Sequence, residues 1–342
     1  MDVDRIVESI QAEEERKKEE AEQLRETVAE ARFDGGVETA FSHTVEGERP
    51  DDFTVAAVDG GLAREELHGL DLVLRRGVAS VFRYRDGTLE EAEYIPGKNP
   101  SPEMEYVTRR ADRTQVDRLA ALLRLQSEIE AALDAVGEAD LLLLDGSVLP
   151  QQRDRPDEDS AMFDRYEELV EQYTALYDRA AEHGTTVAGV VEDARSSRMC
   201  RLLEEHGFSG DVLEHGRDTV LLTYLLDPGE RTMVTQYRGP AVGDIGDDGF
   251  YLFYLRTVEK DRPVRVEFHS HGNPVEEADA IASRLLSLCG EGSSYGIPPV
   301  LIEADQRAKL GGNEVDLLTK RIKAKLAHLP GIENLRRDRR PF

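Results

Sequence analysis

The chain has 342 residues, 39% hydrophobic and 33% charged, with 70 acidic against 43 basic residues and a formal net charge of −27. A chain of this length forms one large domain or two modest ones, and it buries a core without needing a disulfide framework. Its two cysteines, Cys200 and Cys289, exclude a cysteine-rich zinc site and fit a reducing cytoplasm. The N-terminus lacks the apolar region of a signal peptide, and no run of about 18 apolar residues is present. We therefore expect a cytoplasmic protein without a membrane contact.

The acidity comes with a scarcity of lysine, because only 8 of the 43 basic residues are lysines. A surface rich in carboxylates and poor in lysine is typical of proteins made for molar salt, where the Debye length falls to about 3 Å. Phosphate normally repels an acidic protein. A halophilic habitat explains the acidity differently and leaves room for a DNA-binding cleft. The alternative is a mesophilic protein that is simply acidic.

The first predicted element is a long polar helix over residues 4–33, with few apolar positions among its Glu, Lys and Arg runs. Such a helix does not bury itself in a core, so we expect a solvated arm or a dimer contact. We place this N-terminal arm at residues 1–34 and a linker at residues 34–50.

From residue 53 onward, short apolar segments alternate with amphipathic ones. The pattern predicts strands at 53–58, 70–74, 77–83, 90–95, 141–144 and 186–191, and helices at 111–136, 160–183 and 195–206. Apolar strands that alternate with helices indicate parallel pairing and burial on both faces. The order, three strands and then alternating helices and strands, predicts a ribonuclease H-like α/β fold, a mixed sheet flanked by helices.

Further strands are expected after residue 219, so we expect one domain at 50–330 with additional β-strands at about 220–268. The expected elements are strands at 220–225, 233–237, 250–255 and 264–268, a helix at 274–289, a proline-interrupted turn and strand at 295–303, and a helix at 304–328. A basic tail follows at 331–342. Its arginines contact DNA phosphates or an acidic partner, or they serve only as a solubilising tail.

Two aspartates occupy matching positions in this pattern. Asp59 follows the strand segment VAAV, Asp145 follows LLLL, and small residues come after each. If the two strands are parallel neighbours, both carboxylates emerge at the carboxyl edge of the sheet, where open α/β sheets bind ligands. Two neighbouring anions repel unless a cation lies between them, and oxygen ligands suit Mg²⁺ or Mn²⁺. An Asp-Gly turn is the alternative for each position.

A third carboxylate is expected from the helix at 111–136, where Glu128 and Glu130 both border the apolar stripe. Alanines lie beside Glu128 on the helix surface and would let the helix pack closely against a sheet. Leucines lie beside Glu130. The periodicity therefore favours Glu128 slightly and leaves both candidates open.

Taken in order, several segments resemble the NurA family of archaeal nucleases. These are AAVDGG at 56–61, the helix with Glu128, LLLLDGS at 141–147, VAGVVEDARSSR at 187–198, RVEF at 265–268 and GIPPVLIEADQRAKL at 296–310. The resemblance implies a dimeric ribonuclease H-like nuclease that depends on Mn²⁺ (or Mg²⁺) and cuts single-stranded DNA and the 5′ ends of double-stranded DNA. It also implies end resection for recombination together with the hexameric ATPase HerA. The metal-binding acids carried over from the family are Asp59, Glu128 and Asp145.

The sequence departs from the family pattern at three positions. Glu192 stands where the family often has Lys, and Ile297 and Asp305 stand where it often has Tyr and His. Asp305 would serve as a further oxygen ligand, and we include it among the catalytic candidates. Glu192 and Asp193 form either a polar turn at a strand end or a part of the site.

Two other functions remain open. The lost Tyr and His would suit a degenerate subunit that only assembles with HerA, while an actin-like sugar or acetate kinase would need phosphate-binding glycine turns, for which Gly311-Gly312 is a weak candidate. No G-x-x-x-x-G-K-[ST] motif is present, so ATP hydrolysis would come from a partner. The pair His269 and His271 has the spacing of zinc ligands, but without further Cys or His nearby it favours a polar turn.

Overall fold

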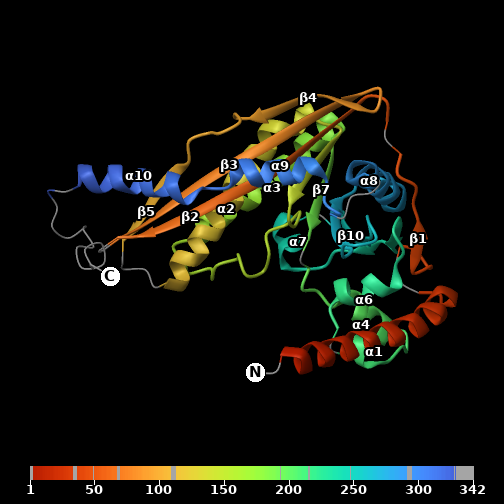
Figure 1. Ribbon diagram of the computed structural model, residues 1–342. Coiled ribbons are helices and arrows are strands. Elements are labelled where there is room, and N and C mark those ends of the chain that lie inside the picture. Colours follow the sequence, from red (N-terminus) through yellow and green to blue (C-terminus); the bar gives the residue numbers. More distant parts are fainter. Residues whose placement is uncertain are drawn as a thin grey trace.

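The computed structural model describes residues 3–33, 37–48, 50–67, 70–108, 113–192, 194–214, 216–246, 248–290, 295–326 and 328. Within these residues, eleven strands form one mixed sheet with helices on both faces (Figure 1). The strand order is β1-β8-β10-β11-β7-β6-β2-β3-β4, with β5 paired to β3 and β9 paired to β10. The predicted mixed sheet flanked by helices is confirmed. In the part of the chain that is described, no helix is long and apolar enough to span a membrane.

The strands are β1 (Ser42–Thr44), β2 (Phe53–Glu66), β3 (Leu70–Arg85), β4 (Thr88–Ile95), β5 (Glu103–Thr108), β6 (Leu141–Asp145), β7 (Thr186–Val191), β8 (Glu230–Thr232), β9 (Thr235–Gln236), β10 (Phe250–Leu255) and β11 (Val264–His269). The α-helices are α1 (Val3–Glu30), α2 (Arg113–Ala135), α3 (Phe163–His183), α4 (Arg198–Glu205), α5 (Asp211–Glu214), α6 (Asp218–Leu225), α7 (Pro240–Ile245), α8 (Pro274–Cys289), α9 (Pro299–Ala308) and α10 (Gly312–Lys325).

The centre of the sheet has the order β4-β3-β2-β6-β7, which is the ribonuclease H-like arrangement. β2 pairs antiparallel with β3 and parallel with β6, and β6 pairs parallel with β7. Apolar side chains on one face of these strands pack against α2 and α3, and those on the other face pack against α8 and α9. The four leucines of β6 are buried because helices cover both faces of the strand.

Three glycines set how closely the helices approach the sheet. A Cβ atom at Gly60 would lie 2.7 Å from Cγ of Glu128, and one at Gly77, its partner on β3, would lie 1.9 Å from the Ser127 carbonyl oxygen. On the opposite face, a Cβ at Gly61 would lie 1.8 Å from the carbonyl oxygen of Ala308. The Asp-Gly-Gly sequence therefore lets α2 and α9 contact β2 directly, one on each face.

The N-terminal helix is only partly the solvated arm that its composition predicts. Its second half buries Ala21, Leu24 and Val28 in a cluster with residues of α4, α5 and α6. Its first half exposes four apolar side chains, which are Val3, Ile6, Val7 and Ile10. Three apolar positions at helical spacing are enough to dock one half of a polar helix.

Several predicted element types and boundaries were wrong. β2 and β3 are longer than expected and form one extended hairpin, with the segments 70–74 and 77–83 belonging to a single strand. Residues 220–225 belong to helix α6, because a short apolar run does not distinguish a strand from a buried helix. The predicted strand at 295–303 is wrong, since Pro299 begins helix α9. The helix expected at 304–328 is divided between α9 and α10, with Gly311 and Gly312 at the break.

Candidate functional site

Asp59 and Asp145 lie side by side at the edge where β6 ends. The parallel register pairs Val58 with Leu144, so Asp59 and Asp145 are the next residues along the two strands. β6 ends at Asp145, and Gly146 turns the chain away with a φ of 125°, a conformation that L side chains rarely adopt. β2 continues past this point without a β6 partner, which leaves the Asp59 side chain at an open edge of the sheet. The parallel pairing predicted for the two strands is observed.

Helix α2 adds Glu128 to this pair. The carboxylates of Glu128 and Asp59 both lie against Nη1 of Arg124, which donates a hydrogen bond to Glu128 Oε1 and lies 4.0 Å from Asp59 Oδ1. Because one nitrogen atom contacts both groups, the two carboxylates share a small space. Glu130 lies elsewhere on α2, with Oε2 3.7 Å from Nη1 of Arg75. Of the two glutamates that the periodicity left open, the structure brings Glu128 to Asp59.

The three acids are desolvated and repel one another. Burial raises the pKa of Glu128 to about 8, with Arg124 opposing the shift and Asp59 and Asp145 adding to it. Burial also raises the pKa of Asp145 to about 7, and the charge of Asp59 adds to the shift. The pKa of Asp59 is raised by burial, against the hydrogen bond that Gly60 N donates at 2.7 Å. The carboxylates therefore form an electrostatically coupled group.

Asp305 belongs to the same group but lies at its exposed side. It is on α9, and its charge contributes to the raised pKa values of both Asp59 and Asp145. Ile297 lies in the apolar core and is 4% exposed, so it has no place in a polar site. Asp193, the other residue considered for the site, lies outside the described residues.

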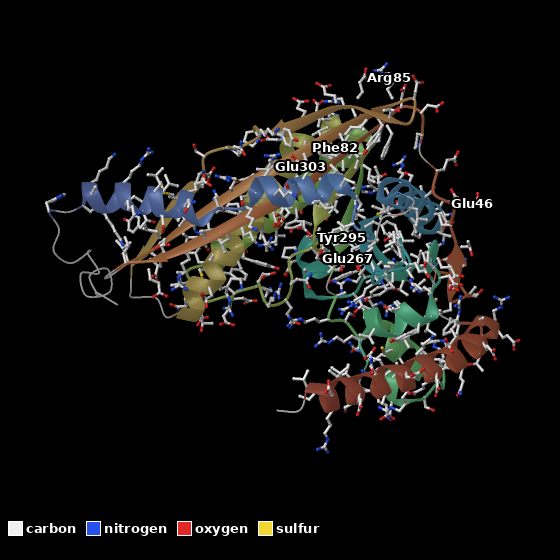
Figure 2. All side chains as sticks on the ribbon, in the orientation of Figure 1. Glu46, Phe82, Arg85, Glu267, Tyr295 and Glu303 are labelled. Atoms are coloured by element: carbon white, nitrogen blue, oxygen red, sulfur yellow. The ribbon has the colours of Figure 1, made fainter. Side chains whose placement is uncertain are left out.

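Tyr295 and Glu192 also face the acids. Burial raises the pKa of Tyr295, and the charges of Glu192 and Asp145 add to this shift, as does a hydrogen bond to Glu192. Figure 2 shows Tyr295 near the centre of the molecule, below α9. Tyr295 was not among the residues predicted from the sequence, where the position of interest was Ile297. The sequence did offer a signal for this residue, because Tyr295 is the only tyrosine in the segment between α8 and α9.

The loop after Asp145 is fixed by a buried glutamate on β11. Glu267, which is labelled in Figure 2, is fully buried. Its Oε2 accepts hydrogen bonds from the Ser147 hydroxyl and from Val148 N at 3.2 Å. Its Oε1 lies 2.7 Å from Nη2 of Arg265. The sequence signal for this contact was Glu267 itself, a charged residue in the buried strand segment VRVEFH.

A cavity of about 910 Å³ opens beside Glu128 and Asp145. Its walls combine aliphatic side chains and Tyr173 with the four arginines Arg124, Arg153, Arg195 and Arg265. A pocket with both guanidinium groups and apolar surface, placed next to a group of carboxylates, suits a ligand that carries phosphate and an apolar part.

The donor set fits a hard divalent cation in its chemistry. Asp59, Glu128 and Asp145 supply only oxygen ligands, and the buried negative charge that raises their pKa values would be relieved by a cation. As the side chains stand, no three Asp, Glu, His or Cys residues of the described ranges converge tightly enough to hold a metal ion. His269 instead packs against the rings of Tyr177, Phe250 and His271.

This sheet order, with coupled carboxylates at the carboxyl ends of its central strands, defines the class of protein as α/β with a ribonuclease H-like core. The chain belongs to the NurA family, because the family model described as the NurA domain matches residues 53–310.

Among solved structures, the chain is similar to the NurA nuclease from Sulfolobus solfataricus, with a TM-score of 0.60 and 15% sequence identity over 96% of this chain and 95% of that one. A NurA structure bound to dAMP and manganese gives a TM-score of 0.47 and 11% identity, over 96% of each chain. An endonuclease V from Streptomyces avermitilis gives 0.35 and 15%, over 89% of this chain and 94% of that one. No curated protein sequence matches the chain.

Proposed function

We propose that this protein is a metal-dependent deoxyribonuclease that hydrolyses phosphodiester bonds in single-stranded DNA and at the 5′ ends of double-stranded DNA. The observation that carries the proposal is the group of buried carboxylates from β2, α2 and β6, two of which contact one guanidinium at the edge of a cavity lined by arginines. Membership of the NurA family supports it, and the similar structure from Sulfolobus solfataricus is described as a nuclease.

Asp59, Glu128 and Asp145 would hold the cation, Mn²⁺ or Mg²⁺, with Asp305 as a further oxygen ligand from α9. A bound ion of this kind lowers the pKa of water and neutralises charge that builds on the scissile phosphate. The NurA structure described with dAMP and manganese supports the choice of metal. The oxygen-only donor set in this chain agrees with it.

The chain's own side chains have separable tasks in this scheme. The carboxylates of Asp59, Glu128 and Asp145 fix the site at the end of rigid strands and a helix. The arginines of the cavity attract the phosphates on the substrate strand. Glu267 holds the Ser147 loop, and with it the backbone that follows Asp145, in one position.

The wider role in this proposal is resection of DNA ends for double-strand-break repair by homologous recombination, with the hexameric ATPase HerA as partner. The sequence lacks a phosphate-binding motif for ATP, which agrees with an ATPase in a separate subunit. We further propose a homodimer whose contact includes the N-terminal arm, because the first half of α1 exposes apolar side chains at helical spacing.

The test is a cleavage assay on end-labelled single-stranded and double-stranded DNA, with Mn²⁺ or Mg²⁺ and over a range of salt up to molar KCl. We expect the wild-type chain to cut, and Asp145→Asn and Glu128→Gln to lose at least about 100-fold in rate, because each removes a charged ligand. Glu130→Gln is the matched control on the same helix. It should cut like the wild type, because Glu130 pairs with Arg75 away from the site.

Cleavage by Asp145→Asn at the wild-type rate would remove Asp145 from the mechanism. A different result would favour the degenerate-subunit alternative: no cleavage by the wild-type chain with either metal, together with stable assembly with HerA. The departures at Ile297 and Asp305 are the reason to keep this alternative in the design of the experiment.

A further inference from the structure

Arg124 occupies an unusual place for a basic side chain. It lies one helical turn before Glu128 on α2, it contacts the carboxylates of Glu128 and Asp59 through the same nitrogen, and it lines the cavity beside them. Its side chain is 34% exposed, so it reaches from the buried acids to the cavity. A single guanidinium therefore offsets part of a negative charge supplied by at least three carboxylates.

This position is the one that a divalent cation would also be drawn to. A metal ion held by Asp59 and Glu128 would lie within a few ångströms of the Arg124 guanidinium, and two cations at that distance repel strongly in a partly buried site. The present contacts of Arg124 and occupancy of the acids by a metal therefore compete. Arg124 has room to turn away from the metal, because the other side of its side chain faces the cavity.

We infer that Arg124 serves as an internal counter-ion, holding Asp59 and Glu128 together in the metal-free protein and turning into the cavity when a divalent cation binds. In the cavity its guanidinium binds a phosphate of the DNA strand. This inference rests on the proposed nuclease function and assigns to Arg124 a role that couples metal binding to substrate binding.

The chemistry of the side chain suits both positions. A guanidinium forms paired hydrogen bonds equally well with carboxylate and with phosphate, and it keeps its charge at any working pH. Its long side chain reaches either partner without movement of α2. Arg153 and Arg195 line the same cavity, so a phosphate there would meet several positive groups.

The first measurement is Mn²⁺ affinity without DNA, by electron paramagnetic resonance or calorimetry. Arg124→Gln should bind Mn²⁺ at least about fivefold more tightly than the wild type, because the competing cation is gone. Arg118→Gln is the matched control on α2. Arg118 lies 4.0 Å from the exposed Asp157, outside the cavity and the site, and its replacement should leave Mn²⁺ affinity unchanged.

The second measurement separates binding from catalysis on single-stranded DNA. Arg124→Gln should raise KM about tenfold with a smaller change in kcat, since a phosphate contact is lost. Arg124→Lys keeps the charge and loses the paired geometry, so it should bind Mn²⁺ like the wild type and still show a raised KM. Circular dichroism spectra would confirm that each variant is folded.

Unchanged Mn²⁺ affinity in Arg124→Gln, or a weaker one, would overturn the counter-ion role. An unchanged KM would overturn the phosphate contact. Both failures are distinct from failure of the proposed function, in which the wild-type chain itself neither binds Mn²⁺ nor cuts DNA. That last result would overturn this inference as well.

Discussion

Two of the buried groups of charged side chains in the described part of the chain differ in how their charge is balanced. In the first, Arg231 on β8 is 1% exposed and donates hydrogen bonds to both oxygens of Glu38, at 2.7 and 2.9 Å, and to Asp279 at 2.7 Å. Glu38 also accepts a hydrogen bond from Val234 N at 2.7 Å. In the second, the cation whose charge acts on Asp59, Glu128 and Asp145 is the guanidinium of Arg124.

The difference is the one we expect between a structural group and the proposed metal site. Around Arg231 each strong donor has an acceptor, and the group ties the segment before β1 to β8 and α8. Around Arg124, burial raises the pKa values of Glu128 and Asp145, the excess of negative charge adds to the shift, and both effects cost stability. Perturbed pKa values of this kind cluster at functional sites, so the imbalance supports the proposed binding of a further cation there. Removing a charge should therefore have opposite effects in the two places.

The largest expected effect is at Arg231. The substitution Arg231→Met leaves the buried carboxylate of Glu38 without its cation, and we expect a loss of about 3–5 kcal/mol in the free energy of unfolding. Urea denaturation of the metal-free protein at constant salt measures this. The control is Arg85→Met, an exposed arginine (Figure 2) that pairs with Glu90 at 2.9 Å, and it should leave the free energy of unfolding nearly unchanged. Equal losses in the two variants would contradict a structural role for the Arg231 group.

Among Asp59, Glu128 and Asp145, removal of a charge should instead raise the free energy of unfolding. Glu128→Gln removes a buried charge that its neighbours repel, so the metal-free variant should be more stable than the wild type at pH 8, by on the order of 2–4 kcal/mol. Its nuclease activity should be lost at the same time. Thermal denaturation in the presence of a chelator measures the gain. A less stable Glu128→Gln protein would show that the charge of Glu128 holds the fold together, as that of Arg231 does.

The pH dependence of stability follows from the same shifts. The pKa of Glu128 rises from 4.5 to about 8 on folding, and that of Asp145 rises from 3.8 to about 7. The folded protein therefore binds these protons more tightly than the unfolded chain does. Their contribution to stability is fully present below about pH 4 and is lost as the pH rises through about 7 and 8. Glu128→Gln should flatten this decline between pH 5 and pH 8.

Much of the fold was predictable because its signals are local. The apolar run LLLL at 141–144 predicted a strand buried on both faces, and the order of strands and helices predicted the ribonuclease H-like core. The failures also have local reasons. VLLTYL at 220–225 is a short and mostly apolar segment, so its periodicity could not separate helix from strand. The docking of Ala21, Leu24 and Val28 depends on partners more than 150 residues away in the sequence.

The candidate site also has residues that the sequence predicts and residues that it does not. Asp59 and Asp145 could be placed together because each follows a strand and the two strands were predicted to be parallel neighbours. Arg124, Tyr295 and Glu267 could not, because their importance depends on contacts across the sheet edge. Periodicity favoured Glu128 over Glu130 only slightly, and the approach of α2 to Gly60 and Gly77, which periodicity does not reveal, decides between them.

The smallest expected effect is at Ser147, a residue that contacts a buried charge and also lies next to the acids. Its hydroxyl donates to Glu267, a fully buried carboxylate that also accepts from Val148 N and contacts Arg265. Ser147→Ala removes one of these partners, so we expect a loss of about 1 kcal/mol in stability. Because Ser147 follows Asp145 by two residues, the loosened loop should also lower kcat several-fold without changing KM. Ser147→Thr, which keeps the hydroxyl, should restore most of kcat. If alanine lowered stability alone, Glu267 would belong with the structural group of Arg231, and the acid site would depend less on its neighbouring loop than the geometry indicates.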